Sequence, residues 1–147
     1  MKRIHFITGL VAFVAFLATG MIMRFHDPPM TELSDAMRLF MRSRHIFILS
    51  AALLNLVAGC YLSPCPHGWR RVAQAIGSGL LILAPFPLVV AFFLDPKRND
   101  LDAPISHIGL YALFAATVLH VVSCWRKGPV QPLADVHPAS ESQETSS

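Results

Sequence analysis

The stretch VAQAIGSGLLILAPFPLVVAFFL, residues 72–94, decides the fold because it contains no charged side chain. An α-helix rises about 1.5 Å per residue, so about 20 apolar residues are needed to cross the roughly 30 Å hydrocarbon core of a bilayer. This stretch meets that length, and it carries too few polar residues for the surface of a soluble helix. We therefore expect it to span a membrane.

Three further apolar runs flank this stretch on both sides. Residues 4–23 and 105–125 contain no charged side chain, and residues 46–62 form a shorter uncharged run. Short polar connections separate the runs, and irregular backbone or open sheet edges are excluded from lipid. The expected fold class is an all-α integral membrane protein, an up-down bundle of four transmembrane helices formed by residues 1–127.

The overall composition supports the same class. Hydrophobic residues make up 54% of the chain, charged residues only 14%, and the mean hydropathy is +0.51. Soluble domains carry about a quarter charged residues. The formal net charge of +3 is small and the basic residues are dispersed, so we expect no nucleic-acid partner. The expected partner is the lipid bilayer.

An amphipathic pattern precedes the second run. Apolar side chains recur at three- and four-residue spacing from Leu33 to Met41, and charged side chains fall on the opposite face. This pattern predicts a helical lead-in that lies in the headgroup layer, or stands above it, before the chain turns into the membrane. Thr31 or Ser34 is the expected N-cap.

The two ends of the chain carry separate expectations. Residues 128–147 have no apolar periodicity, so we expect a disordered C-terminal tail. At the other end, Lys2 and Arg3 precede an apolar run in which Ala18, Thr19 and Gly20 resemble a signal-peptide cleavage site. A cleaved signal peptide is therefore the alternative to a first membrane span.

The orientation depends on charges outside the spans. Lys and Arg are evenly divided between the two faces, but the loops opposite the termini also carry acidic residues, and the first span begins directly after Lys2 and Arg3. We expect a bacterial cytoplasmic (inner) membrane protein with both termini in the cytoplasm. The cysteines would then face a reducing compartment and stay as thiols.

Two histidines lie near the starts of the second and fourth spans. Because these spans run in the same direction, His45 and His107 are expected at similar depth, on diagonal helices. Such a pair could bind a b-type haem, and Arg42 and Arg44 could contact the propionates. We expect the four residues to form one polar cluster even without a cofactor. The alternatives are anchoring in the headgroup layer or a quinone or anionic-lipid site.

A second candidate site gathers soft ligands toward the terminal face. Thiolate and imidazole are ligands that zinc and monovalent copper prefer. Against a metal, Cys60 and Cys65 lack the two-residue spacing common in zinc sites, and a cysteine in an apolar helix is usually a core residue. The candidate ligands are Cys60, Cys65, His120 and Cys124, with His67 and His5 nearby.

The third span carries features of packing rather than chemistry. Ala73 with Gly77, and Ala75 with Gly79, form small-residue faces that allow another helix to approach closely, within the protein or across a homodimer. Pro85 and the proline two residues later remove backbone donors and predict a bend, for which a packing kink and a gating hinge are the two interpretations.

The function is inferred from the expected fold class and from the catalytic motifs that the sequence lacks. The sequence contains no P-loop, dinucleotide-binding, zinc-protease or nucleophile-elbow motif. We expect a non-enzymatic accessory or interaction subunit that associates with other membrane subunits or with a second copy. One alternative is a membrane haem or quinone-binding redox protein that uses His45 and His107. The second is a metal or small-solute transport component.

Overall fold

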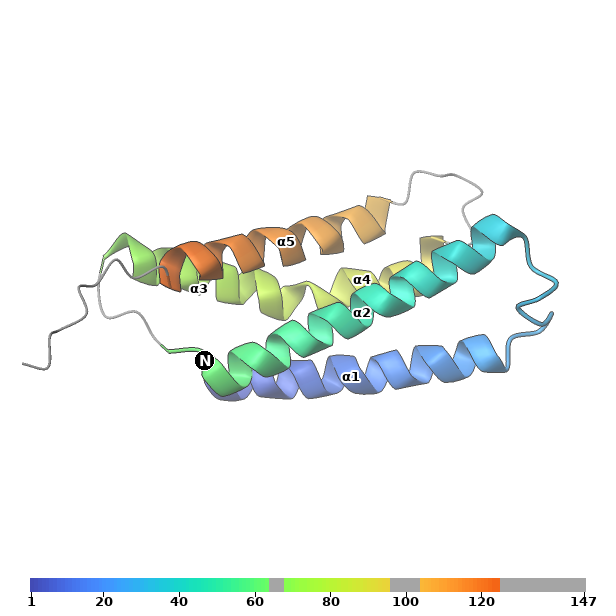
Figure 1. Ribbon diagram of the computed structural model, residues 1–147, viewed down its shortest axis with the longest axis horizontal. Coiled ribbons are helices and arrows are strands. Elements are labelled where there is room, and N and C mark those ends of the chain that lie inside the picture. Colours follow the sequence, from blue (N-terminus) through green and yellow to red (C-terminus); the bar gives the residue numbers. More distant parts are fainter. Residues whose placement is uncertain (64–67, 96–103, 125–147) are drawn as a thin grey trace, which may run out of the picture.

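The computed structural model describes residues 1–63, 68–95 and 104–124, and this part of the chain is helical without strands. Figure 1 shows how the helices are arranged. Four helical stretches are long and apolar enough to cross a membrane, and α3 and α4 together form one of them. The predicted tail, residues 128–147, lies outside the described residues. The helices are α1 (Lys2–Arg24), α2 (Asp35–Tyr61), α3 (Trp69–Leu83), α4 (Pro85–Leu94) and α5 (Pro104–Cys124).

Helix α2 begins at the predicted cap. The backbone N–H of Met37 donates to the Oγ of Ser34 at 3.3 Å, which satisfies one of the free donors of the first turn. From Asp35 the helix continues without a break to Tyr61. The amphipathic lead-in is therefore the first part of the same long helix as the apolar run, and no turn separates the two. Met41 on its apolar face is buried in the core.

The third apolar stretch is interrupted where its prolines predict a bend. Helix α3 ends at Leu83, and Ala84 still donates its N–H to the carbonyl of Leu80 at 2.9 Å. Pro85 then starts α4, because proline has no N–H to donate to the preceding turn. Ala84 and Pro85 are themselves buried, so the interruption lies inside the molecule.

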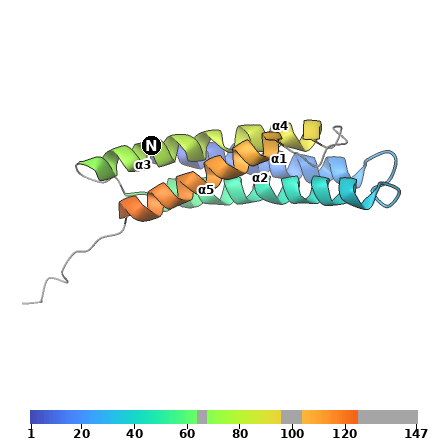
Figure 2. The same cartoon turned by 90° about the horizontal axis from the view of Figure 1, so that it is seen from above.

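The helices associate in two closely packed pairs. Helix α1 lies along α2, helices α3 and α4 lie along α5, and α2 contacts α4 between the pairs (Figures 1 and 2). Glycines permit the closest approaches. A Cβ at Gly59 of α2 would lie 2.7 Å from the backbone N of Phe6 in α1, and one at Gly77 of α3 would lie 3.2 Å from the carbonyl O of Ala116 in α5. The expectation that Gly77 admits a neighbouring helix is confirmed.

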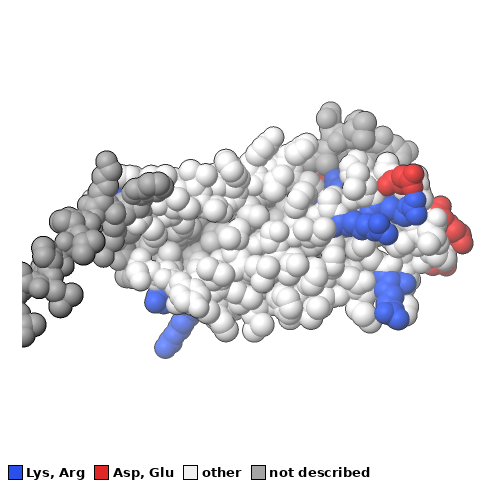
Figure 3. Space-filling view, in the orientation of Figure 1, with Lys and Arg blue, Asp and Glu red and all other residues white. Residues whose placement is uncertain are grey.

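The two ends of the molecule differ in character. We call the end with the N-terminus, the start of α3 and the end of α5 the terminal end, and the end with the α1–α2 connection the opposite end (Figure 1). On the face drawn in Figure 3, charged side chains gather toward the two ends and the middle is uncharged. That distribution is the one expected of helices whose middle sections contact lipid. Between the pairs, the core includes Ile48, Leu81, Leu88, Phe92 and Leu113.

Candidate functional site

The histidines predicted to form a pair face different partners. The ring of His45 stacks on Phe16 of α1 at a centroid distance of 4.1 Å, and its Nδ1 lies 2.9 Å from the Oγ1 of Thr19. That hydroxyl donates its proton to a backbone carbonyl, so it accepts from the imidazole. His107 is exposed and stacks on Tyr111 of its own helix, at 6.0 Å.

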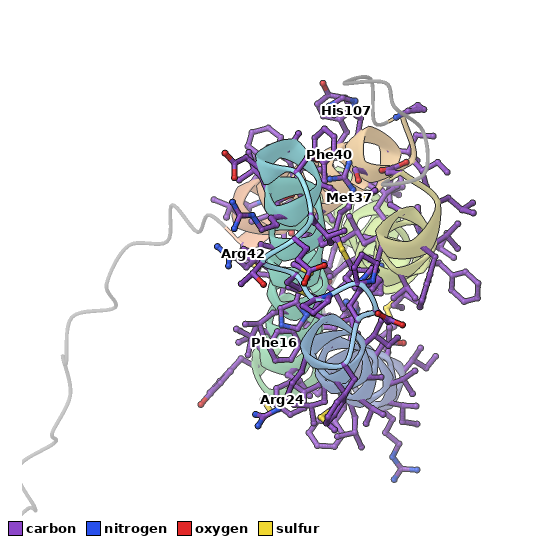
Figure 4. The ribbon with its side chains drawn as sticks, turned by 90° about the vertical axis from the view of Figure 1, so that its right-hand side faces the viewer. Phe16, Arg24, Met37, Phe40, Arg42 and His107 are labelled. Carbon is purple, nitrogen blue, oxygen red and sulfur yellow. The ribbon has the colours of Figure 1, made fainter. Side chains whose placement is uncertain are left out.

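The two arginines of the predicted cluster also separate. Arg42 is exposed and points outward, on a different side of the molecule from His107, as Figure 4 shows from the opposite end. Arg44 is buried and turns toward α4. The expected single cluster does not form, because α2 pairs with α1 rather than with α5 and so directs His45 away from His107. A haem bound by these two histidines stays a prediction from the sequence alone.

Arg44 instead belongs to a buried ion pair with Asp95, which follows α4 directly. Its Nε and Nη2 both donate to Oδ2 of Asp95, at 3.2 Å each, and its Nη1 donates to the carbonyl of Phe40 at 3.0 Å. The guanidinium also lies over the ring of Phe40, 4.5 Å from the centroid. The side chains of the pair are 3% and 0% exposed, so each charge depends on the other for compensation.

Asp95 also holds the first turn of α5. Its Oδ2 accepts from the backbone N–H of Ser106 at 3.2 Å and from the Ser106 hydroxyl. A carboxylate in this position satisfies a free N–H donor and interacts favourably with the positive end of the helix dipole. One side chain therefore joins α2, α4 and α5 at the opposite end. Asp95 directly follows the apolar stretch 72–94, in what was expected to be a polar connection, and its contacts with Arg44 and Ser106 were not predicted.

A second polar cluster lies toward the terminal end, and we call His5, Asn55 and His120 the histidine cluster. His5 is completely buried one turn into α1, and its Nδ1 lies 3.0 Å from Oδ1 of Asn55 in α2. The amide nitrogen of Asn55 donates to the carbonyls of Leu81 at 2.7 Å and Ala51 at 3.0 Å. Asn55 of α2 thus connects α1 to α3.

The hydrogen bonds of Asn55 fix the tautomer of His5. Both amide hydrogens are used by carbonyl oxygens, so the amide oxygen is the atom that faces the imidazole. His5 must then donate from Nδ1. In the neutral ring the proton is on Nδ1, and Nε2 carries a lone pair that is buried and has no hydrogen-bond partner among the described residues.

The ring of His120 in α5 lies next to the ring of His5. The two imidazole centroids are 6.3 Å apart and the ring planes meet at 72°. Both ring nitrogens of His120 are buried and, within the described ranges, without a partner, as is Oγ of Ser78 in α3. Buried polar atoms in proteins are normally satisfied, so this concentration of unsatisfied ones is unusual. His5 was expected near the terminal face, and its contact with Asn55 was not predicted.

The predicted metal ligands are mostly not part of this cluster. Cys60 and Cys124 are free and exposed, whereas Cys65 and His67 lie outside the described residues. Of the four candidate ligands, His120 belongs to the histidine cluster, together with His5, which was expected nearby. In the part of the chain that the structure describes, no group of three or more His, Cys, Asp or Glu side chains is placed to hold a metal ion.

A cavity also lies at the terminal end. A cavity of about 640 Å³ is lined by residues at the start of α1 and by Leu62 and Gln74. Ile4 in this lining precedes His5, and Gln74 lies one helical turn before Ser78. The remaining lining residues are Met1, Lys2 and Arg3. The cavity therefore lies beside two cationic side chains, and its lining contains residues that neighbour His5 and Ser78 in the chain.

The fold and these clusters define the class as an all-helical protein with four helices long and apolar enough to cross a membrane, and with buried polar groups toward each end. No protein-family model, curated protein or solved structure matches the chain.

Proposed function

We propose that this is an integral membrane protein that binds a small ligand at the histidine cluster. The observation that carries the proposal is the set of buried imidazole nitrogens, Nε2 of His5 and both nitrogens of His120, without partners among the described residues. A buried polar group that makes no hydrogen bond costs free energy, and polar side chains within membrane spans are usually functional. A ligand that engages these nitrogens offsets that cost.

The proposed topology is an up-down bundle of four transmembrane helices in a bacterial cytoplasmic membrane, with both termini in the cytoplasm. Lys2 and Arg3 precede the apolar part of α1, whereas Asp27, Glu32 and Asp35 belong to the opposite end. The histidine cluster would then lie near the cytoplasmic surface. A reporter fused to Ser147 tests the orientation, because a fusion active only outside the cytoplasm contradicts it.

We further propose that the bound ligand serves an accessory role, held for other membrane subunits or between copies of a homodimer. The cluster draws on three spans, so the ligand would also stabilise the association of the helix pairs. The large apolar side chains exposed on α1, among them Ile7, Val11 and Val14, would contact lipid or such a partner.

The ligand site is tested by comparing stability with binding. Both proteins are first treated with a chelator in mild detergent. We expect the free energy of unfolding of His120→Leu to exceed that of the wild type by about 1–3 kcal/mol, because an unsatisfied buried polar group has been removed. Residues that serve binding rather than folding show this trade-off. His107→Leu, at an exposed histidine of the same helix, is the matched control and should change stability little. A loss of stability in His120→Leu would mean that the histidine is a structural residue.

A further inference from the structure

We propose that the ligand of the histidine cluster is a monovalent copper ion, bound by Nε2 of His5 and a ring nitrogen of His120. This inference rests on the proposed function, because it names the ligand of the same site. It depends on three properties of the cluster: an oriented donor, the distance between the rings, and the charge of the surroundings.

The donor atom on His5 is oriented by its neighbour. Metal-binding histidines generally donate their second ring N–H to an oxygen, which fixes the tautomer and the ring orientation. Asn55 provides that oxygen at 3.0 Å, and its own amide is held by the carbonyls of Leu81 and Ala51. Nε2 of His5 therefore presents a lone pair, buried and prepared for an electrophile.

The distance between the rings fits one ion bound by both. Metal–imidazole bonds are about 2.0–2.1 Å, so two imidazoles on opposite sides of one ion have centres roughly 6 Å apart. The observed separation of His5 and His120 is 6.3 Å. Zinc favours four tetrahedral ligands, and the described residues supply no third His, Cys, Asp or Glu at this place. Monovalent copper, a d¹⁰ ion, accepts two ligands in a linear arrangement, and imidazole suits copper.

The charge of the surroundings favours a monovalent ion. Desolvation of an ion in a low-dielectric interior becomes more costly with the square of its charge, and paired carboxylates normally compensate it. The acidic side chains that the structure describes all belong to the opposite end, and Lys2 and Arg3 are cationic beside the cavity. Among the described residues, none would therefore compensate the second charge of a divalent ion at this place. The described acids are Asp27, Glu32, Asp35 and Asp95.

The terminal end, where the cavity lies, is the end from which we infer that the ion enters. The lining of the cavity includes Ile4, which precedes His5 in the chain, and Gln74, one turn before Ser78. In the proposed orientation this end faces the cytoplasm, where reducing conditions keep copper monovalent. The ion would enter from the compartment that holds it in the required oxidation state.

Anaerobic titration of the purified full chain tests the proposal. Monovalent copper is supplied in competition with a chromophoric copper(I) chelator, and silver(I) serves as a redox-inert substitute. We expect one ion per chain in the wild type and a fall in affinity of at least about a hundredfold in His120→Ala, since even the outer partners of a metal site contribute about 10–100-fold. His107→Ala and a Cys60→Ser, Cys124→Ser double variant are controls that should bind as the wild type does.

X-ray absorption of the copper-loaded wild type tests the same site without substitution. We expect two nitrogen ligands with the scattering pattern of imidazole and no sulfur. Copper bound equally by His120→Ala, or through sulfur, overturns the proposal. If zinc or a haem binds in a His120-dependent manner and copper does not, the ligand is wrong but the proposed binding function stands. If no metal binds and His120→Leu loses stability, both fail.

Discussion

Arg44 and His45 are adjacent in the chain, yet they join α2 to opposite neighbours. Arg44 pairs with Asp95 at the end of α4, whereas His45 binds Thr19 and stacks on Phe16 of α1. Successive helical residues are separated by about 100°, so one turn of α2 serves both contacts. At this level α2 is fixed between α1 and the end of α4, and its rotation about its own axis is determined by two independent polar contacts.

The ion pair is expected to dominate stability at the opposite end. Arg44→Met leaves Asp95 charged and buried, and loss of one partner of a buried pair costs about 3–5 kcal/mol. The double variant Arg44→Met, Asp95→Leu should recover much of this loss, because no charge is left uncompensated. Unfolding in detergent measures both. Arg42→Met, at an exposed arginine of the same helix, is the control, and a single variant no worse than this control would contradict the burial of the pair.

The contact of His45 with α1 is expected to be weaker. Thr19→Val keeps the shape of the side chain but removes the oxygen that accepts from Nδ1 of His45 at 2.9 Å. A neutral hydrogen bond contributes about 0.5–1.5 kcal/mol. We expect a loss of that order, and a double-mutant cycle with His45→Phe should show coupling of similar size. Thr31→Val, at an exposed threonine, should be neutral. Additive effects of the two changes would argue that the contact does not form.

Close helix packing makes a sharper prediction at two glycines. A Cβ at Gly59 would lie 2.7 Å from the backbone of Phe6, so Gly59→Ala must push α1 away from α2, at a cost of about 1–3 kcal/mol. At Gly79 a Cβ would meet no neighbouring helix within 4 Å, and Gly79→Ala should be neutral or stabilising, since alanine favours the helix by about 1 kcal/mol. Thermal unfolding of the two variants distinguishes them. Equal effects would contradict the α1–α2 packing.

The sequence predicts those features that depend on local composition. The four apolar helices, a cap at Thr31 or Ser34 and a bend at the prolines follow from hydrophobic length, side-chain oxygen and a missing N–H. The structure confirms the four helices, places the cap at Ser34 and interrupts the third apolar stretch before Pro85. The polar contacts do not follow, because they depend on how the helices pair. Helical periodicity predicts the face of α2 on which His45 lies, but it does not predict which neighbouring helix packs against that face.

The same limit explains the residues that were missed. Asp95 comes directly after an apolar run, where an acidic residue is equally typical of the start of a loop. Its role appears only once Arg44 is buried beside it. His5 and Asn55 lie far apart in the chain and meet because Gly59 lets α1 approach α2 closely. An asparagine in the middle of an apolar helix is the signal that marks a buried polar contact before its partner is known.

The hydrogen bonds of Asn55 are expected to contribute strongly to stability. Asn55→Leu removes the acceptor of His5 Nδ1 and the donor to Leu81, two polar groups that stay buried. Each buried group left unpaired costs about 1–3 kcal/mol, so we expect a larger loss than from Thr19→Val. Adding His5→Leu to Asn55→Leu should restore part of the stability, because one of the unpaired groups is then gone.

Asn55→Gln separates the chemistry of this contact from its position. Glutamine carries the same amide but extends it by one methylene in a fully buried site, so the bond to His5 Nδ1 cannot keep its 3.0 Å geometry without displacing α1. We expect Asn55→Gln to lose stability as Asn55→Leu does. Monovalent copper should not restore the stability of either variant. Ser50→Leu, at a residue of the same helix whose hydroxyl bonds only its own backbone, is the control and should lose little. If Asn55→Gln were as stable as the wild type, the amide would not be held between His5 and Leu81, and Nε2 of His5 would have no fixed orientation.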